Sequence, residues 1–374
     1  MELGPKTRVL VVDDSTFMRK VLQSIITADP QMEVIGEARD GREAVAMADS
    51  LRPDVVSMDI MMPHVDGLQA TQMIMSKNPR PIVIVSSETK EGADITLKAL
   101  ELGAIDFVPK PVSGIDLDMQ HLRDELCRKL KVASRVRVIR TITRSGAKPP
   151  AASSYSEGKF TPSEASSQVS LLASGNAKFP IVVVAASTGG PQMLMQFVPA
   201  LPRDFGAAVL LVQHMPGTFT AQFAKQLAEV SAVRVKEAEN NDPLQPASVY
   251  VCPGARHMRV MANGRLSIEG GERINGYRPC ADVAMETAAT YAGPMTIAVV
   301  LTGMGADGSK GVQAVKTAGG HVIAQDEVTS VIFGMPAEAI KTGMVDQVLA
   351  IDAIMPAIEK RILYLMGAAE VGVV

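Results

Sequence analysis

The chain has 374 residues, a formal net charge of -3, 47% hydrophobic residues and 21% charged residues. This length exceeds one ordinary hydrophobic core, so we expect two domains. The near-neutral charge provides no basic field, which argues against nucleic-acid binding. The first residues, MELGPKTR, contain no apolar signal segment, and no apolar run reaches the roughly 18 residues of a membrane span. Three cysteines without a CxxC pair fit a reducing compartment, so we predict a cytoplasmic protein without membrane insertion.

The first predicted domain, residues 6–131, alternates short apolar strands with amphipathic helices. Helical spacing of apolar residues appears between the strands, as in FMRKVLQSIITAD and GREAVAMADSL, and a last helix is expected over about 114–131. Five strand-then-helix units predict a parallel sheet covered on both faces. The predicted strands are TRVLVV, MEVIGEA, DVVSMD, PIVIVSS and AIDFV.

Residues 132–178 are predicted to form a flexible linker. Their central stretch, SGAKPPAASSYSEGKFTPSEASSQ, is too poor in large apolar residues to offset the entropy of an ordered chain. A second α/β pattern follows over residues 179–370 and predicts another open, mostly parallel sheet. In such sheets, ligands bind beyond the carboxyl ends of the strands. The predicted strands are FPIVVVAAS, AAVLLVQ, SVYVCP, MTIAVVLTG, HVIAQD and MVDQVLA.

Acidic residues follow two strand ends of the first domain. Asp13 and Asp14 end the first strand, Asp59 ends the third, Ser86 ends the fourth, and Lys110 follows the fifth. A single aspartate there is most simply a helix cap. Crowded carboxylates repel one another unless a cation neutralises them, and oxygen ligands suit Mg²⁺. The sequence therefore predicts a magnesium-assisted phosphoryl site, with the lysine and serine available to the phosphoryl group.

This set of residues resembles the receiver domain of two-component response regulators over about residues 6–130. The resemblance implies a flavodoxin-like (CheY-like) fold and a phosphoryl group that Asp59 accepts from a histidine kinase. It implies Mg²⁺ binding by Asp14, Asp59 and the Met61 carbonyl, with Asp13 in the acidic pocket. It also implies switch roles for Ser86, Phe107 and Lys110.

In the second domain, Ser187, His214 and Asp307 each lie just beyond a predicted strand. A serine hydroxyl needs a nearby base to act as a nucleophile. We therefore expect His214 to accept its proton and Asp307 to orient the imidazole. Backbone amides at the helix start after Ser187, such as that of Thr188, are candidate oxyanion donors.

The STGG loop that contains Ser187 also allows a different interpretation. Backbone amides at a helix start can hold a phosphate, although no Walker lysine and no GxGxxG pattern is present. A phosphorylation-gated module whose STGG loop binds a nucleotide or a phosphorylated partner is therefore the alternative to a hydrolase. The order Ser-His-Asp along the chain and the absence of GxSxG disfavour chymotrypsin, subtilisin and α/β-hydrolase relationships. The sequence contains no evident helix-turn-helix motif or basic stripe, which argues against a DNA-binding regulator.

The segments ASTGG, QHMP, TGMGADG and QDEVTSVIFGMPAEAI are similar to those of the chemotaxis methylesterase CheB family over about residues 179–367. The resemblance implies a doubly wound α/β methylesterase domain with Ser187, His214 and Asp307 as its triad and the Met304 amide as an oxyanion donor. It implies hydrolysis of glutamyl methyl esters and deamidation of glutamines on chemoreceptors, with no cofactor for the esterase chemistry. Ala185 stands where the family usually has glycine. Because a receiver is joined to this domain, we expect the receiver to block access to the triad until Asp59 is phosphorylated.

Overall fold

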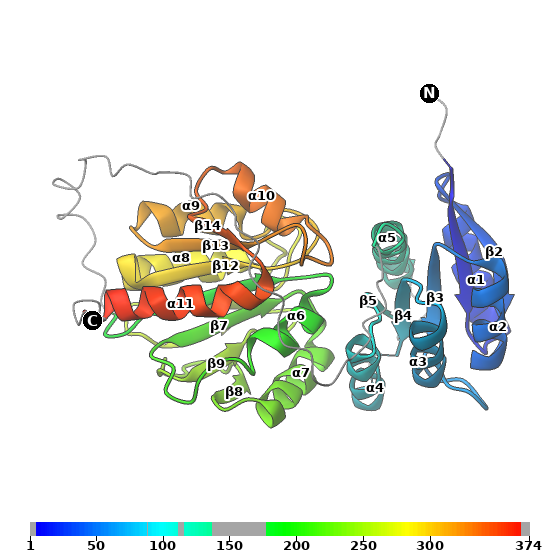
Figure 1. Cartoon of the computed structure of the whole chain (residues 1–374), viewed down its shortest axis with the longest axis horizontal. Helices are drawn as coiled ribbons and strands as arrows, with labels where there is room; N and C mark the ends of the chain where they lie inside the picture. The colour runs from blue at the N-terminus through cyan, green and yellow to red at the C-terminus, as the bar shows by residue number, and fades with distance from the viewer. Residues whose placement is uncertain (1–4, 88, 111–115, 137–176, 368–374) are drawn as a thin grey trace, which may run out of the picture.

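The computed structural model describes residues 5–87, 89–110, 116–136 and 177–367. These residues form two α/β domains, drawn in blue to cyan and in green to red in Figure 1. Most of the predicted linker, 132–178, lies outside the described residues. Within the described part of the chain, no helix is both long enough and apolar enough to cross a lipid bilayer.

The N-terminal domain is a five-stranded parallel sheet in the order β2-β1-β3-β4-β5. Alternate residues of β1 face opposite sides, so Val9 and Val11 pack with α1 and α5, whereas Leu10 and Val12 pack on the α2–α4 side. The predicted fold and strands are present. The elements are β1 (Thr7–Val12), α1 (Thr16–Thr27), β2 (Met32–Ala38), α2 (Gly41–Leu51), β3 (Val55–Asp59), α3 (Gly67–Lys77), β4 (Ile82–Ser86), α4 (Lys90–Glu101), β5 (Asp106–Pro109) and α5 (Asp116–Ala133).

The C-terminal domain is built on a seven-stranded parallel sheet in the order β14-β13-β12-β6-β7-β9-β8. Its strands are β6 (Ile181–Ala186), β7 (Ala208–Gln213), β8 (Arg234–Glu237), β9 (Ser248–Val251), β12 (Thr296–Val300), β13 (His321–Gln325) and β14 (Gln347–Leu349). A separate antiparallel hairpin pairs β10 (His257–Val260) with β11 (Leu266–Glu269). The predicted strand list lacks β8 and this hairpin.

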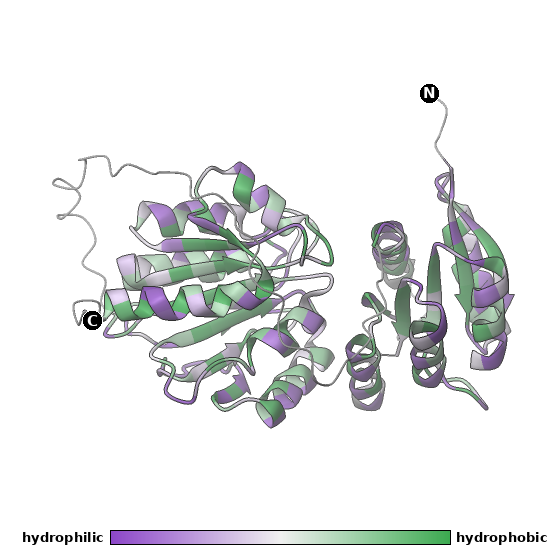
Figure 2. Ribbon diagram, viewed as in Figure 1, coloured by the Kyte–Doolittle hydropathy of each residue, from purple (hydrophilic) through white to green (hydrophobic). Residues whose placement is uncertain are grey.

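Helices cover both faces of the larger sheet. The helices are α6 (Gly190–Phe197), α7 (Gly217–Val230), α8 (Ala281–Ala292), α9 (Ser309–Thr317), α10 (Met335–Lys341) and α11 (Ile351–Leu365), with a 3-10 turn at Gly293–Met295. Val182 and Val184 of β6 pack with residues of α6, α7 and α11, whereas Ile181 and Val183 pack with residues of α8. Figure 2 shows the apolar strands enclosed between helices that carry polar residues. Both faces are buried, which explains the continuous apolar runs of the strands.

The chain changes direction in the sheet at β6. From β6 it proceeds through β7 towards one edge and later returns to β12, on the other side of β6. A crevice forms at the carboxyl ends of the strands where the winding reverses in this way. Residues that follow β6, β7 and β12 therefore meet at one place.

The N-terminal domain, called the receiver below because of its sequence resemblance, contacts the larger domain through α4, which packs against α6 and α7. Phe107 of β5 stacks on Phe219 of α7, with ring centroids 4.3 Å apart and an interplanar angle of 23°. One cluster of buried apolar residues continues from the receiver into the larger domain and includes Leu100, Phe107, Phe219 and Phe223. An apolar core is therefore continuous across the contact between the domains.

Candidate active site

Ser187 lies at the turn from β6 into α6. Its backbone N–H donates to the Thr302 carbonyl at 3.0 Å, which ties the turn to the end of β12. Gly189 has a φ of +75°, and a Cβ there would lie 2.4 Å from Cβ of Val331. Only glycine fits both the left-handed backbone and the close approach of Val331. Gly189 of the STGG loop thus allows a sharp turn with the serine at the sheet edge.

His214 lies beside Ser187 because β6 and β7 are adjacent parallel strands. Ala186 and Gln213 are paired in register, and the His214 N–H donates to the Ala186 carbonyl at 3.1 Å. The buried amide of Gln213 donates to the carbonyls of Ser187 at 2.9 Å and His214 at 3.1 Å. The two residues are therefore held at neighbouring positions by the strands and by one glutamine.

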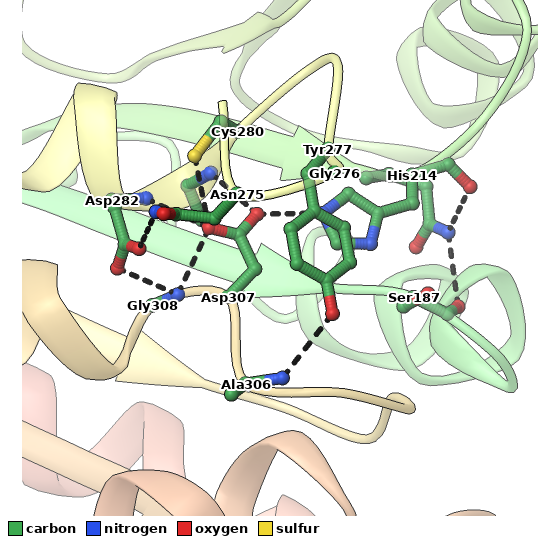
Figure 3. Close-up of polar contacts among 12 residues, drawn as sticks. Ser187, His214, Asn275, Gly276, Tyr277, Cys280, Asp282, Ala306, Asp307 and Gly308 are labelled. Atoms are coloured by element: carbon green, nitrogen blue, oxygen red, sulfur yellow. Dashed lines mark hydrogen bonds and ion pairs between the residues drawn. The ribbon is translucent and has the colours of Figure 1, made fainter. Parts of the chain in front are cut away.

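Asp307 follows β12 and contacts the imidazole directly. His214 Nε2 lies 2.7 Å from Asp307 Oδ2, and Asp307 is only 1% exposed. Besides His214, Asp307 accepts from three donors at the start of α8, where a carboxylate is favoured by the helix dipole (Figure 3). These are the N–H groups of Ala281 at 2.7 Å and Asp282 at 3.1 Å and the Cys280 thiol at 3.1 Å, and the Gly308 N–H donates as well, at 3.1 Å.

These contacts fix the ionisation of the carboxylate. Burial by itself would raise the pKa of Asp307, but the hydrogen bonds from His214 and from the backbone hold that pKa below its usual value. Burial and the adjacent Asp307 raise the pKa of the Cys280 thiol, which therefore stays protonated and donates. Asp307 is consequently an ionised acceptor that can orient an imidazole.

The hydrogen bond to Asp307 determines which imidazole nitrogen is basic. With Nε2–H donating to the carboxylate, Nδ1 carries the lone pair. Among the described residues no hydrogen bond joins the Ser187 hydroxyl to this ring, although both side chains lie at the same sheet edge (Figure 3). Catalytic hydrogen bonds are often long without substrate.

Backbone donors surround the serine. Within the described part of the chain, the N–H groups of Thr188 and Met304 donate to no protein acceptor. The Gly303 backbone approaches Ser187 so closely that a Cβ on Gly303 would lie 2.8 Å from Cβ of Ser187. The two predicted oxyanion donors therefore lie on segments that flank Ser187. Ala185, two residues before Ser187, is fully buried in the sheet.

The loop is less suited to a phosphate. The Thr188 hydroxyl donates to Asp106 Oδ2 of the receiver at 2.6 Å. Asp106 is also paired with Lys129, whose ammonium lies 3.0 Å from Oδ1. A carboxylate bonded to the Thr188 hydroxyl would repel a phosphate bound to the amides of the same loop. This contact disfavours the nucleotide-binding alternative.

The receiver brings its predicted acidic residues together. Asp13, Asp14 and Asp59 each offer an oxygen within 4.8 Å of the others. Lys110 Nζ lies 2.8 Å from Asp13 and 2.9 Å from Asp59. Burial, with a further contribution from Asp13, raises the pKa of Asp59 against the opposing effect of Lys110. Three oxygen donors and excess negative charge suit a divalent cation.

The predicted switch residues Ser86 and Phe107 belong to β4 and β5, the two strands that follow β3 in the sheet. Ser86 is buried, and its hydroxyl lies 3.4 Å from the Gly92 carbonyl. Phe107 faces the other domain and contacts Phe219. Met61 follows Asp59 and has an exposed side chain, and its N–H lies 3.4 Å from Asp59 Oδ1. The switch residues therefore connect the acidic pocket with the domain interface.

Three residues of the site have no counterpart in the sequence-based prediction. Gln213 and Asp106 act through contacts between distant segments, and no local pattern reveals them. Tyr277 stacks on the His214 ring with centroids 4.8 Å apart. Its position has a local signal, the Asn-Gly turn of INGY, which is typical of a tight hairpin.

Comparison with known proteins places this site in a family. A model of the CheB methylesterase family matches residues 182–358, and a model of the response regulator receiver domain matches residues 9–122. A protein-glutamate methylesterase/protein-glutamine glutaminase of Pyrococcus horikoshii is 46% identical over 99% of this chain and 97% of its own length. The chain belongs to the CheB family of methylesterases. The predicted resemblance, the fold class and the assignment as a protein-glutamate methylesterase/protein-glutamine glutaminase are thereby confirmed.

Other relatives agree with this membership. The protein-glutamate methylesterase/protein-glutamine glutaminase of Thermotoga maritima is 43% identical over 91% of this chain and 94% of its own length. The crystal structure of the CheB methylesterase catalytic domain from the same organism is 42% identical and covers 50% of this chain and 100% of that one, with a TM-score of 0.48. The alignment with the Thermotoga maritima protein includes both domains of this chain, since it covers 91% of the chain.

The environment of Asp307 predicts a pH-dependent contribution to stability. Because its folded-state pKa lies below the ordinary 3.8, the ionised carboxylate stabilises the fold above about pH 4, and this contribution is lost as the pH falls through the folded-state pKa. Asp307→Asn should lower the free energy of unfolding by about 1–3 kcal/mol at pH 7. The difference from the wild type should shrink below pH 4 in urea unfolding followed by circular dichroism.

Asp282→Asn provides the matched control. Burial raises the pKa of Asp282, so the stability difference between Asp282→Asn and the wild type should grow, not shrink, as the pH falls. A difference between wild type and Asp307→Asn that is the same at every pH would contradict the assignment of an ionised, stabilising Asp307.

Proposed function

We propose that this CheB-family chain is a phosphorylation-controlled hydrolase whose nucleophile is Ser187, with His214 as base and Asp307 as the residue that orients it. The observation that carries the proposal is the 2.7 Å bond between His214 and Asp307 at the strand end next to Ser187. Its substrates are glutamyl methyl esters, and specific glutamines, on the cytoplasmic helices of chemoreceptors. The family membership supports this substrate class.

The proposed reaction has two halves. In the first, Ser187 Oγ attacks the ester carbonyl carbon while His214 Nδ1 takes the hydroxyl proton. The tetrahedral intermediate then collapses, the carbon–oxygen bond to the methoxy group breaks, and the imidazolium protonates methanol as it leaves. In the second, the imidazole deprotonates a water molecule, which attacks the acyl-enzyme. Ser187 leaves with the proton, and a glutamate carboxylate and one proton are released to solvent.

Charge develops on the carbonyl oxygen in both halves. The N–H groups of Thr188 and Met304 have no protein acceptor among the described residues, which supports them as donors to this oxygen. Donors that are fixed before the reaction stabilise the oxyanion without reorganisation. For a glutamine substrate, the same steps apply with ammonia as the leaving group in place of methanol.

We propose that the receiver restrains this site when it is unphosphorylated. The Thr188–Asp106 hydrogen bond connects the residue after the nucleophile with β5 of the receiver. Gln192 of α6 donates to the carbonyls of Leu100 at 3.0 Å and Ala104 at 2.8 Å. A receiver docked in this way restricts the approach of a receptor helix to Ser187.

Phosphorylation of Asp59 by a chemotaxis-type histidine kinase would release the restraint. The residues that would hold Mg²⁺ are Asp13, Asp14, Asp59 and the Met61 carbonyl, and the ion would neutralise charge on the phosphoryl oxygens. The new phosphoryl charge competes for Lys110 and attracts the Ser86 hydroxyl. Withdrawal of Phe107 from Phe219 would then weaken the interface.

The role of Ser187 predicts the largest loss of activity. Ser187→Ala removes the attacking atom and should lower kcat for methanol release from methylated receptor membranes at least about 10³-fold. Ser231→Ala, at the end of α7, is the control and should retain wild-type turnover. A Ser187→Ala protein with normal methanol release would rule out this mechanism.

The polar contacts at the interface predict a gain of activity. The variant Gln192→Ala/Gln222→Ala removes three hydrogen bonds to the receiver, including that of Gln222 to Asp94 at 2.7 Å. Each bond contributes about 0.5–1.5 kcal/mol, so methanol release without a phosphodonor should rise at least about fivefold, and stimulation by the phosphodonor should shrink.

Two other glutamines of the same helices give a matched control. Gln196 and Gln226 line a cavity of about 660 Å³ at the domain interface, but neither side chain donates a hydrogen bond within the described residues. Gln196→Ala/Gln226→Ala should leave the unstimulated rate unchanged. Equal unstimulated rates in both double variants and the wild type would contradict control by docking of the receiver.

A further inference from the structure

Tyr277 connects the two functional parts of the candidate site, the imidazole and the loop after β12. We infer that Tyr277 is a positioning residue of the hydrolase: its ring holds the plane of His214, and its hydroxyl holds the loop that carries the Met304 amide. The inference rests on the proposed roles of Ser187, His214 and Asp307. It assigns Tyr277 no contact with the reacting atoms.

The position of Tyr277 follows from the local sequence. Ile274 and Tyr277 exchange two backbone hydrogen bonds of 3.0 Å, which closes a two-residue hairpin. The central residues, Asn275 and Gly276, have φ values of +52° and +88°. Positive φ at both positions is the signature of a type I′ turn, which Asn-Gly favours. The sequence INGY therefore specifies a turn with the tyrosine at its exit.

The turn is anchored to the elements that support Asp307. Lys310, in α9, donates to the Asn275 side-chain oxygen at 3.1 Å. The Asn275 amide nitrogen lies 3.5 Å from Asp282, near the start of α8 (Figure 3). Asp282 in turn accepts hydrogen bonds from the N–H groups of Gly308 and Gly311. Tyr277 is thus held relative to Asp307 by side chains of two helices.

The phenol ring of Tyr277 covers one face of the imidazole. The ring centroids lie 4.8 Å apart and the planes differ by 16° (Figure 3). A single hydrogen bond at Nε2 leaves the imidazole free to tilt about that contact. An aromatic face against the ring restricts this tilt and directs Nδ1 towards the strand end that carries Ser187. The stack therefore fixes an orientation that the Asp307 bond alone leaves open.

The hydroxyl of Tyr277 extends past the imidazole to the loop of residues 303–308. It accepts a hydrogen bond from the Ala306 N–H at 3.3 Å. Gly305 has a φ of +96°, and a Cβ there would lie 1.9 Å from the tyrosine oxygen. The loop therefore follows the hydroxyl closely, and glycine is required by both its backbone and its neighbour. This contact fixes the segment immediately after Met304.

One side chain consequently sets the distance between the base and the oxyanion loop. A shift of about 1 Å in such geometry can reduce the rate about 100-fold without any change in substrate contacts. Loss of Tyr277 should therefore lower kcat and leave KM nearly unchanged. A residue that merely filled space would lower stability and spare kcat in the folded fraction.

The test measures kcat and KM for methanol release from methylated receptor membranes with the full chain and a phosphodonor. Tyr277→Phe keeps the stack and removes the hydroxyl, so kcat should fall about 3- to 10-fold. Tyr277→Leu removes both contacts, so kcat should fall about 30- to 300-fold, with KM within about twofold of the wild type. Tyr364→Leu, an exposed tyrosine of α11, is the matched control and should change neither constant.

Ser187→Ala, measured in parallel, separates this inference from the proposed mechanism. If Ser187→Ala is inactive while Tyr277→Leu behaves like Tyr364→Leu, the positioning role is wrong and the mechanism stands. If Ser187→Ala is active, the mechanism itself is wrong. Should Tyr277→Leu fail to fold, Tyr277→Phe decides alone, and a kcat within twofold of the wild type contradicts the inference.

Discussion

The structure of the site depends on the hydrogen bond between His214 and Asp307, 2.7 Å long, across the point where the sheet reverses its winding. Because the two residues follow strands on opposite sides of β6, the bond requires β12, β6 and β7 to be paired in register. The buried carboxylate stays ionised since the first turn of α8 and the imidazole both stabilise its charge. The His214–Asp307 hydrogen bond therefore depends on the pairing of the strands and, at the same time, orients the proposed base.

The same sheet edge is where the receiver docks. The turn after Ser187 contributes Thr188 to the hydrogen bond with Asp106, and α6, which begins in that turn, contributes Gln192 to the contacts with α4. The apolar core beneath these bonds is continuous from one domain to the other. Only a few contacts thus separate the receiver from the nucleophile. This proximity gives the proposed control by phosphorylation a short physical path.

Much of the fold and part of the site follow from the sequence alone. Buried parallel strands are continuous apolar runs, so the residues after them, such as Ser187 and His214, can be assigned to one edge of the sheet from the strand pattern. The edge strand β8, RVKE, lacks that pattern because it is partly exposed. Gln213 and Asp106 were not predicted because their roles arise from partners distant in sequence. Tyr277 could be predicted only in part, since INGY predicts its turn but not its contact with the His214 ring.

The most direct test of the account is the reactivity of Ser187 towards a fluorophosphonate, which a base-activated serine attacks at phosphorus with loss of fluoride. The labelled residue and its rate are read by peptide mass spectrometry on the full chain. We expect labelling at Ser187, at least about 100 times slower in His214→Ala and faster when a small phosphodonor is present. Absence of label at Ser187, or a labelling rate independent of His214, would contradict the proposed convergence of the hydroxyl, the imidazole and the carboxylate.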